Sequence, residues 1–190
     1  MKKETRKQIQ SKVIPDSTNK SKQIVESILE IITDKDKSIA LFYPTKTEVD
    51  ILPLIQKLLT ENKIVSLPVI TNIKERKMKF CQLTHFDELI EDIYKIPAPI
   101  NGKLITKFDV IIVPCVTINK DFKRLGMGGG FYDSFLSQVK ATQRAKLITP
   151  LFAENAFSDF IADDWDAKMD IVVTEQGTYY SSDNSFSTNS

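Results

Sequence analysis

Four of the six glycines in this 190-residue chain lie between residues 126 and 130. Glycine permits positive φ angles and lets the backbone approach a ligand closely. An apolar, β-branched run at residues 110–113 precedes the cluster, and a segment typical of a helix begins at Phe131. A strand, a glycine loop and a helix start together present backbone N–H groups that can bind phosphate. Residues 109–136 therefore predict a nucleotide phosphate loop.

Two charged side chains flank the glycine cluster. Arg124 precedes it, and a guanidinium can hold a phosphate through two parallel hydrogen bonds. Asp133 follows it, and carboxylate oxygens are ligands that Mg²⁺ prefers. The alternatives are a tight turn without a ligand and an acid that only interacts with the helix N-terminus. The arginine, the glycines and the aspartate lie within ten residues of each other, and this combination favours a Mg-nucleotide site.

The loop matches neither standard nucleotide-binding motif. The sequence contains no GxxxxGK[ST] segment, which excludes a Walker A loop. Phe131 stands where the dinucleotide motif GxGxxG requires its third glycine.

The composition is that of an ordinary globular protein. Lysine and arginine total 26 and aspartate and glutamate 25, so a net charge of +1 creates no global attraction to nucleic acid or membranes. Cys81 and Cys115 lie in separate apolar runs typical of buried, reduced thiols, and the single histidine, His85, excludes a multi-histidine metal site. The charged N-terminus lacks the apolar segment of a secretory signal. We expect a cytoplasmic monomer.

The elements that must position the loop follow from hydrophobic periodicity. It predicts helices at residues 2–13, 20–33, 48–62 and 131–140, and strands at residues 38–43, 63–67, 78–83, 110–113, 146–152 and 170–174. The sequence between them predicts a short helix or turn at residues 86–94, irregular structure at 96–102 and a helical turn at 157–162.

This alternation of strands and helices predicts an α/β fold: a three-layer α/β/α sandwich, Rossmann-like, with a mostly parallel central sheet. Ligands of such sheets bind beyond the carboxyl ends of the strands, which is where the glycine loop follows its strand. Residues 1–178 are predicted to form one catalytic domain. Residues 179–190 are polar and are predicted to be a disordered tail.

The segment RLGMGGGFYD, which follows DVIIVPCVTINKD, resembles the signature of the 5-formyltetrahydrofolate cyclo-ligase family, also called methenyltetrahydrofolate synthetases. Further similarities follow in order from Lys2 to about Glu175. They lie in KKETR, LFYPTKTEVD, LPVI with KMKF, IPAPING and FIADDWDAKMDIVVTE. The resemblance therefore covers nearly the whole chain.

The resemblance implies ATP- and Mg²⁺-dependent cyclisation of 5-formyltetrahydrofolate to 5,10-methenyltetrahydrofolate, with release of ADP and phosphate. It assigns Lys2 and Arg124 to catalysis. The residues that it assigns to ATP binding are Lys2, Lys3, Glu4, Thr5, Arg6, Arg124, Leu125, Gly126, Met127, Gly128, Gly129, Gly130, Phe131 and Tyr132. Those that it assigns to folate binding are Tyr43, Glu48, Met127, Gly128, Gly129, Gly130 and Phe131. It assigns Mg²⁺ binding to Asp133 and Asp170.

The chain departs from the family pattern at four positions. Thr5 replaces a leucine, Val13 and Ser134 stand where arginine is common, and Phe131 replaces the first tyrosine of the YYD motif. The lost tyrosine hydroxyl removes one hydrogen bond of about 0.5–1.5 kcal/mol. None of these changes removes a phosphate-binding cation or a metal carboxylate, so we expect an active enzyme. The alternative is a non-catalytic or differently specific nucleotide- or folate-binding protein on the same fold.

Overall fold

The computed structural model describes residues 1–181, so residues 182–190 of the predicted tail lie outside the described residues. An eight-stranded sheet forms the centre of the molecule. Its strands are β1 (Ser38–Ala40), β2 (Ile64–Asn72), β3 (Lys77–Leu83), β6 (Leu104–Ile105), β7 (Val110–Ile112), β10 (Lys146–Pro150), β11 (Ile171–Thr174) and β12 (Gly177–Tyr180). Their order in the sheet is β12-β11-β10-β7-β1-β2-β3-β6. The pairs from β11 to β2 are parallel, and β12, β3 and β6 add antiparallel pairs at the two edges.

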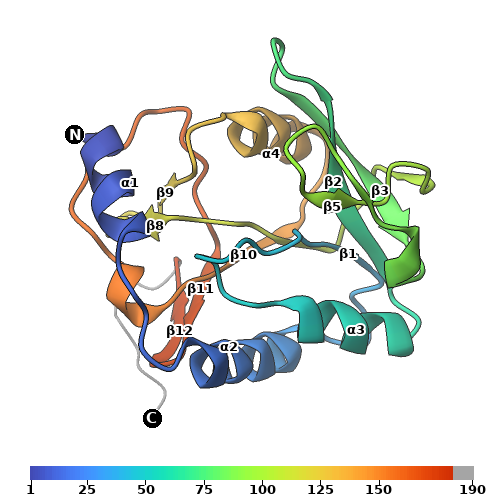
Figure 1. Cartoon of the computed structure of the whole chain (residues 1–190), viewed down its shortest axis with the longest axis horizontal. Coiled ribbons are helices and arrows are strands. Elements are labelled where there is room, and N and C mark those ends of the chain that lie inside the picture. Colours follow the sequence, from blue (N-terminus) through green and yellow to red (C-terminus); the bar gives the residue numbers. More distant parts are fainter. Residues whose placement is uncertain (182–190) are drawn as a thin grey trace.

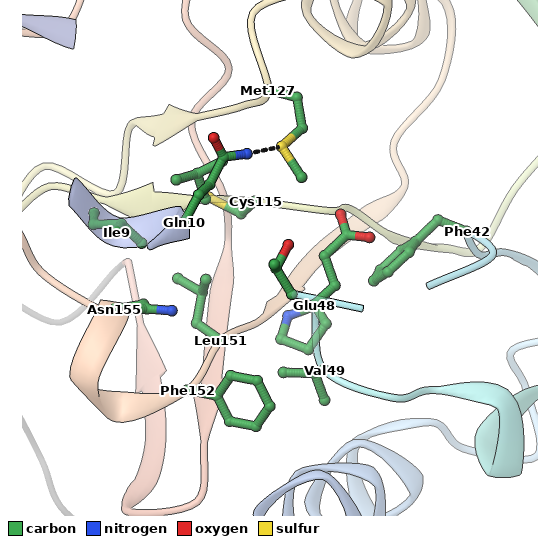
Figure 2. A pocket seen from close by; sticks show the side chains of 13 residues that line it. Ile9, Gln10, Phe42, Glu48, Val49, Cys115, Met127, Leu151, Phe152 and Asn155 are labelled. Atoms are coloured by element: carbon green, nitrogen blue, oxygen red, sulfur yellow. Dashed lines mark hydrogen bonds between the residues drawn. The ribbon is translucent and has the colours of Figure 1, made fainter. Parts of the chain in front are cut away.

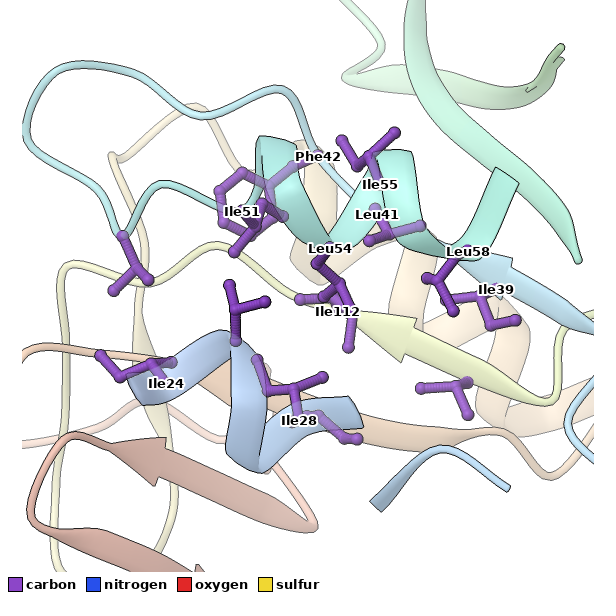
Figure 3. Packing of buried hydrophobic residues seen from close by; sticks show 14 of the residues in the cluster. Ile24, Ile28, Ile39, Leu41, Phe42, Ile51, Leu54, Ile55, Leu58 and Ile112 are labelled. Atoms are coloured by element: carbon purple, nitrogen blue, oxygen red, sulfur yellow. The ribbon is translucent and has the colours of Figure 1, made fainter. Parts of the chain in front are cut away.

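Helices cover both faces of the sheet (Figure 1). α2 (Ser17–Ile31) and α3 (Leu52–Thr60) lie on one face, and α4 (Phe131–Thr142) lies on the other. Successive side chains of a strand point to opposite faces. Ile112 of β7 accordingly packs in one core cluster with α2 and α3, and Ile111 packs in a second cluster with Leu136 of α4. Figure 3 shows the first cluster, with Ile24 and Leu54 around Ile112. The predicted α/β sandwich with a mostly parallel sheet is confirmed.

All four helices differ from their predicted limits: α2 begins three residues before its predicted start, and α4 ends two residues after its predicted end. α1 (Lys2–Gln10) ends three residues early and is anchored by the buried side chain of Ile9. α3 begins at Leu52 and not at Glu48. The backbone N–H and hydroxyl of Thr45 donate hydrogen bonds of 2.8 and 2.7 Å to the Glu48 carboxylate, which makes residues 45–48 a turn. The helix prediction was therefore wrong over its first four residues.

β2 continues through Pro68 to Asn72, although the sequence predicted that the strand would end at this proline. Proline lacks an N–H and is tolerated where no neighbouring strand needs one. The register with β1 stops at Ser66, whereas the antiparallel register with β3 runs on through the Pro68–Phe80 pair. The long β2–β3 hairpin consequently projects beyond the rest of the molecule (Figure 1).

Shorter elements correct other predictions. β4 (Ile90–Glu91) pairs with β5 (Pro97–Ala98) in segments predicted as a turn and as irregular, and a 3₁₀ turn, η1, occupies Phe86–Glu88. The helical turn predicted at residues 157–162 is wrong; a 3₁₀ turn, η2, lies at Ala153–Asn155 instead. Tyr179 and Tyr180, which were assigned to the tail, belong to β12. Within residues 1–181, no helix combines the length and the apolar character needed to cross a membrane.

Candidate active site

A cavity of about 830 Å³ lies at the carboxyl ends of the parallel strands. Phe42 and Tyr43, which follow β1, and Pro114, which follows β7, line it. The glycine loop at residues 126–130 and the first turn of α4 form another wall. This is the edge at which α/β sheets bind their ligands, and the glycine loop predicted to bind phosphate lines the cavity there.

A short hairpin presents the glycine loop to the cavity. β8 (Thr117–Ile118) pairs with β9 (Arg124–Leu125), and residues 126–130 connect β9 to α4. Gly128 and Gly130 have φ angles of 102° and 72°, which side-chain-bearing residues rarely adopt. Among the described residues, the backbone N–H groups of residues 127–130 have no recorded hydrogen-bond acceptor. Four successive residues that line a cavity and have backbone donors without a protein acceptor suit an oxyanion.

Arg124 lies beneath this loop and not free in the cavity. Only 4% of its surface is exposed. Its Nη2 forms an ion pair of 3.0 Å with Asp133, and its Nη1 donates a 2.9 Å hydrogen bond to the Pro114 carbonyl. A Cβ on Gly126 would lie 2.5 Å from Nη1, so the loop can close over the guanidinium only with glycine at this position.

Tyr132 completes the buried polar group below the loop. The Arg124 guanidinium carbon lies 5.5 Å from the centre of the Tyr132 ring. In the part of the chain that the structure describes, the Tyr132 hydroxyl and the Arg124 Nε are buried without a hydrogen-bond partner. Burial raises the pKa of Tyr132 far above its ordinary value, so the hydroxyl keeps its proton near neutral pH.

The N-terminal helix docks directly onto the glycine loop. Arg6 Nε donates a 2.6 Å hydrogen bond to the Gly126 carbonyl. The Lys2 ammonium pairs with Asp163, at 2.6 Å, and with Asp166. Burial lowers the pKa of Lys2, but the hydrogen bonds to these two carboxylates outweigh it and raise the pKa overall. α1 is therefore held in place by contacts within the chain itself.

Not every predicted ATP-binding residue reaches the cavity. Lys2 and Arg6 line it, whereas Lys3, Glu4 and Thr5, from the same helix, do not. Leu125 is fully buried, and its side chain is also absent from the cavity wall. The remaining loop residues, 126–132, all line the cavity. The structure thus brings together two of the five predicted N-terminal residues and most of the loop.

Glu48 lies where the cavity adjoins a smaller pocket, since Phe42, Glu48 and Met127 line both (Figure 2). In Figure 2 its carboxylate points into the space between Phe42 and Met127. Burial raises the pKa of Glu48, and the two hydrogen bonds from Thr45 lower it by less. Cys115, which lines the smaller pocket, is buried as predicted, and burial raises its pKa to about 11. Its thiol is therefore protonated near neutral pH and is no nucleophile.

The structure does not form the predicted pair of metal ligands. Asp133 lines the cavity at the start of α4. Asp170 instead accepts a 2.8 Å hydrogen bond from the Leu147 N–H, at the amino ends of β10 and β11. Those ends lie at the opposite edge of the sheet from the cavity. Residues 1–181 contain no group of three or more histidine, cysteine, aspartate or glutamate side chains placed to bind a metal ion.

The cavity also contains residues that sequence reasoning missed. Asp163, Asp166 and Trp165 come from the acidic segment before β11, and Arg76 comes from the tip of the β2–β3 hairpin. Tyr94 packs edge-to-face on Phe131 with ring centres 6.2 Å apart. For Arg76 and the residues of the acidic segment, the signal in the sequence is the charge of NIKERK and DDWD, which also fits a solvated surface; Tyr94 has no such signal.

Comparisons with known proteins agree along the whole chain. A sequence model of the 5-formyltetrahydrofolate cyclo-ligase family matches residues 1–175. The chain is 28% identical over 179 residues to the 5-formyltetrahydrofolate cyclo-ligase of Mycoplasma pneumoniae, covering 90% of this chain and 96% of that protein. It is 31% identical over 143 residues to the Escherichia coli K12 protein of the same name, covering 72% and 77%. The NMR structure of Aquifex aeolicus 5,10-methenyltetrahydrofolate synthetase superposes with a TM-score of 0.81 at 25% identity, covering 97% of this chain and 94% of that one.

Proposed function

The chain belongs to the 5-formyltetrahydrofolate cyclo-ligase family of enzymes, and on this premise we propose that it uses ATP to convert 5-formyltetrahydrofolate to 5,10-methenyltetrahydrofolate. One observation carries the proposal. A single cavity of about 830 Å³ combines a loop of unpaired backbone N–H groups with an aromatic and apolar wall. Pockets that enclose small organic ligands have roughly 300–1,000 Å³, so this cavity can hold the reacting parts of two substrates together.

We assign the triphosphate of ATP to the glycine loop and the cations around it. The N–H groups of residues 127–130 would hold phosphate oxygens, as loops at helix N-termini do. Lys2 and Arg6 lie on the side of the loop that α1 covers. A phosphate can replace Asp163 and Asp166 as the partner of Lys2. Arg124 would add positive charge from below the loop, through Nε or by moving away from Asp133.

We assign the pterin of the folate to the wall that contains Tyr43 and Glu48. The pterin edge carries N–H donors, and the Glu48 carboxylate, which points into the space between Phe42 and Met127 (Figure 2), can accept hydrogen bonds from them. Met127 and Phe131 lie between this wall and the phosphate side. The loop would therefore contact both substrates at their junction.

The reaction needs positioning more than it needs reactive side chains. The formyl oxygen attacks the γ-phosphorus, and ADP leaves with the electron pair of the broken P–O bond. N10 then attacks the activated carbon and loses its proton, and phosphate leaves with the C–O electron pair. No protein nucleophile takes part. The contribution of this chain is to align the substrates and to neutralise phosphate charge with Lys2, Arg6 and Arg124.

The carboxylates present fit magnesium bound together with a nucleotide. Mg²⁺ keeps several waters and takes one or two protein carboxylates besides phosphate oxygens, so a dedicated cage of acids is not required. Asp133 would supply the carboxylate, because it lines the cavity beside the loop. Mg²⁺ would supply charge neutralisation to the phosphates when bound.

A monomeric state and a single catalytic domain at residues 1–178 stay predictions from the sequence. A cytoplasmic location and the lack of nucleic-acid and membrane partners stay predictions from the balanced charge and the charged N-terminus.

The test is an assay of the purified protein with Mg-ATP and 5-formyltetrahydrofolate, followed by the absorbance of the methenyl product. We expect product only when ATP is present. If no ATP-dependent product forms, the proposed reaction is refuted. Binding of both ligands without product would instead identify a non-catalytic binding protein.

A further inference from the structure

Arg76 reaches the glycine loop from a segment remote in sequence. It lies at the tip of the projecting β2–β3 hairpin and lines the cavity. Its Cδ and Nη1 lie 3.1 Å from the position that a Cβ on Gly130 would occupy. On the other side of the loop, the Arg6 guanidinium carbon lies 3.5 Å from the corresponding position on Gly128. The loop is thus flanked by two guanidinium groups from opposite ends of the cavity wall.

The two flanking arginines differ in their partners. Arg6 is bonded to the Gly126 carbonyl. For the side chain of Arg76, no hydrogen bond or ion pair is found with any described residue. The adjacent acid, Glu75, pairs with Lys77 at 2.5 Å. Since the other cations of the cavity, Lys2 and Arg124, are also paired, Arg76 is the guanidinium that remains available to an anionic ligand.

The surroundings of Arg76 indicate which anion it would bind. Met78, Tyr94 and Phe131 line the same part of the cavity, and the edge-to-face pair of Tyr94 and Phe131 presents aromatic surface. This wall suits flat rings better than a triphosphate. Arg76 itself is exposed, so a group that it binds can extend into solvent.

The charges of the cavity also match the polarity of a folate. Glu48 is partly buried after β1 and offers an acceptor to the donor-rich pterin. Arg76 offers a donor fork at the exposed rim, and a guanidinium binds carboxylates through two parallel hydrogen bonds. A folate has its pterin at one end, an aromatic ring in the middle and glutamate carboxylates at the other end. A carboxylate and a guanidinium from different elements of the same cavity wall would fix its direction.

We infer that Arg76 binds a carboxylate of the folate glutamate and is a specificity-determining residue for that end of the substrate. The inference rests on the proposed function, because it takes a folate as the occupant of the cavity. It adds the orientation of the substrate: the pterin lies inside at Glu48, and the glutamate end lies at the hairpin tip.

The experiment compares Arg76→Ala with the matched control Lys74→Ala, which removes a charge from the same hairpin outside the cavity. Both variants and the wild type are assayed with 5-formyltetrahydrofolate and with its analogue that lacks the glutamate, 5-formyltetrahydropteroate. For Arg76→Ala we expect KM for 5-formyltetrahydrofolate to rise about fivefold, the effect of an exposed ion pair of about 1 kcal/mol. kcat, KM for ATP and KM for the analogue should stay unchanged, and Lys74→Ala should match the wild type in every assay.

Three results would overturn the inference. An equal loss with the analogue would show that Arg76 does not act on the glutamate, and a rise in KM for ATP or a fall in kcat would assign it to the phosphates. An unchanged KM would show that it binds neither.

If the wild type shows no turnover, the proposed reaction is refuted. The inference is then decided separately, by measuring equilibrium binding of the same two compounds to the wild type and to Arg76→Ala. A fivefold weakening by Arg76→Ala that is confined to the glutamate-bearing compound supports it. The inference is refuted if the wild type binds the two compounds equally tightly, or if it binds neither.

Discussion

Replacement of Arg124 by methionine tests whether the glycine loop is built on a buried ion pair. The guanidinium bonds to Asp133 at 3.0 Å and to the Pro114 carbonyl at 2.9 Å. Methionine fills part of the same volume and removes both interactions. A hydrogen bond to a charged group contributes about 1.5–3 kcal/mol. Asp133 remains 22% exposed, so water recovers part of the loss. We expect the free energy of unfolding to fall by about 2–4 kcal/mol.

Urea denaturation followed by circular dichroism measures this change. The control is Lys120→Met, which makes the same replacement at an exposed position of the β8–β9 connection and should change stability by less than about 0.5 kcal/mol. In the combined variant Arg124→Met/Asp133→Asn, the loss should be smaller than the sum of the two single losses, because each single change leaves a charge without its partner.

A second measurement separates stability from catalysis. At a temperature where Arg124→Met is still folded, we expect it to lose most ATP-dependent turnover, because the loop has lost its support and the phosphates have lost a cation. Unchanged stability would refute the ion-pair role of Arg124. Normal turnover by the folded variant would refute its role at the phosphates.

Three further predictions concern single positions. Gly128→Ala places a side chain at a φ of 102°, and we expect a loss of about 1–3 kcal/mol in stability or ATP affinity, measured by denaturation and nucleotide titration; a fully normal variant would contradict the loop geometry. Because burial raises the pKa of Glu48, the folded state retains its proton more tightly than the unfolded state and loses stability as pH rises above 4.5. Glu48→Gln lacks this loss of stability. The difference in unfolding free energy between this variant and the wild type, measured by denaturation, should therefore grow in favour of the variant from pH 4.5 to neutral pH. A difference that stays constant with pH would show that the pKa of Glu48 is not raised. Asp133→Asn should raise the Mg²⁺ concentration that gives half-maximal activity, whereas Asp170→Asn, at the opposite edge of the sheet, should not; equal effects of the two variants in Mg²⁺ titrations would refute this assignment.

The sequence allowed prediction of those features that depend on local pattern. Glycine density between a strand and a helix predicted a loop with an unusual backbone, and the positive φ angles at Gly128 and Gly130 give the physical reason for that density. The alternation of apolar strands with amphipathic helices predicted the layers, because each face of the sheet must be covered. Both predictions rest on residues that are close together in the chain.

The features that could not be predicted depend on residues that are far apart. The length of β2 is one example: whether Pro68 ends a strand depends on the neighbouring strand, and β1 ends before reaching it. The pairs of Lys2 with Asp163 and Asp166 join the two ends of the chain, and no local pattern indicates them. For Asp170, the predicted topology already contained information that the prediction of a metal ligand did not use. A residue that precedes a parallel strand lies at the amino edge of the sheet, so its position before β11 already argued against a site at the carboxyl edge.

In the proposed function, the cations and the backbone N–H groups of the cavity would contribute differently to the binding of a nucleotide, because the cations already have partners within the chain. Lys2 is already bonded to carboxylates and Arg124 to Asp133, so a phosphate that binds either cation exchanges one anionic partner for another. Such an exchange contributes little net free energy, although it keeps the cations oriented before ATP arrives. The N–H groups of residues 127–130, by contrast, gain partners that the described residues do not give them. In the proposed function, the exposed N–H groups of the glycine loop would exchange water for phosphate oxygens, and the paired cations would chiefly set the position and charge of the phosphates.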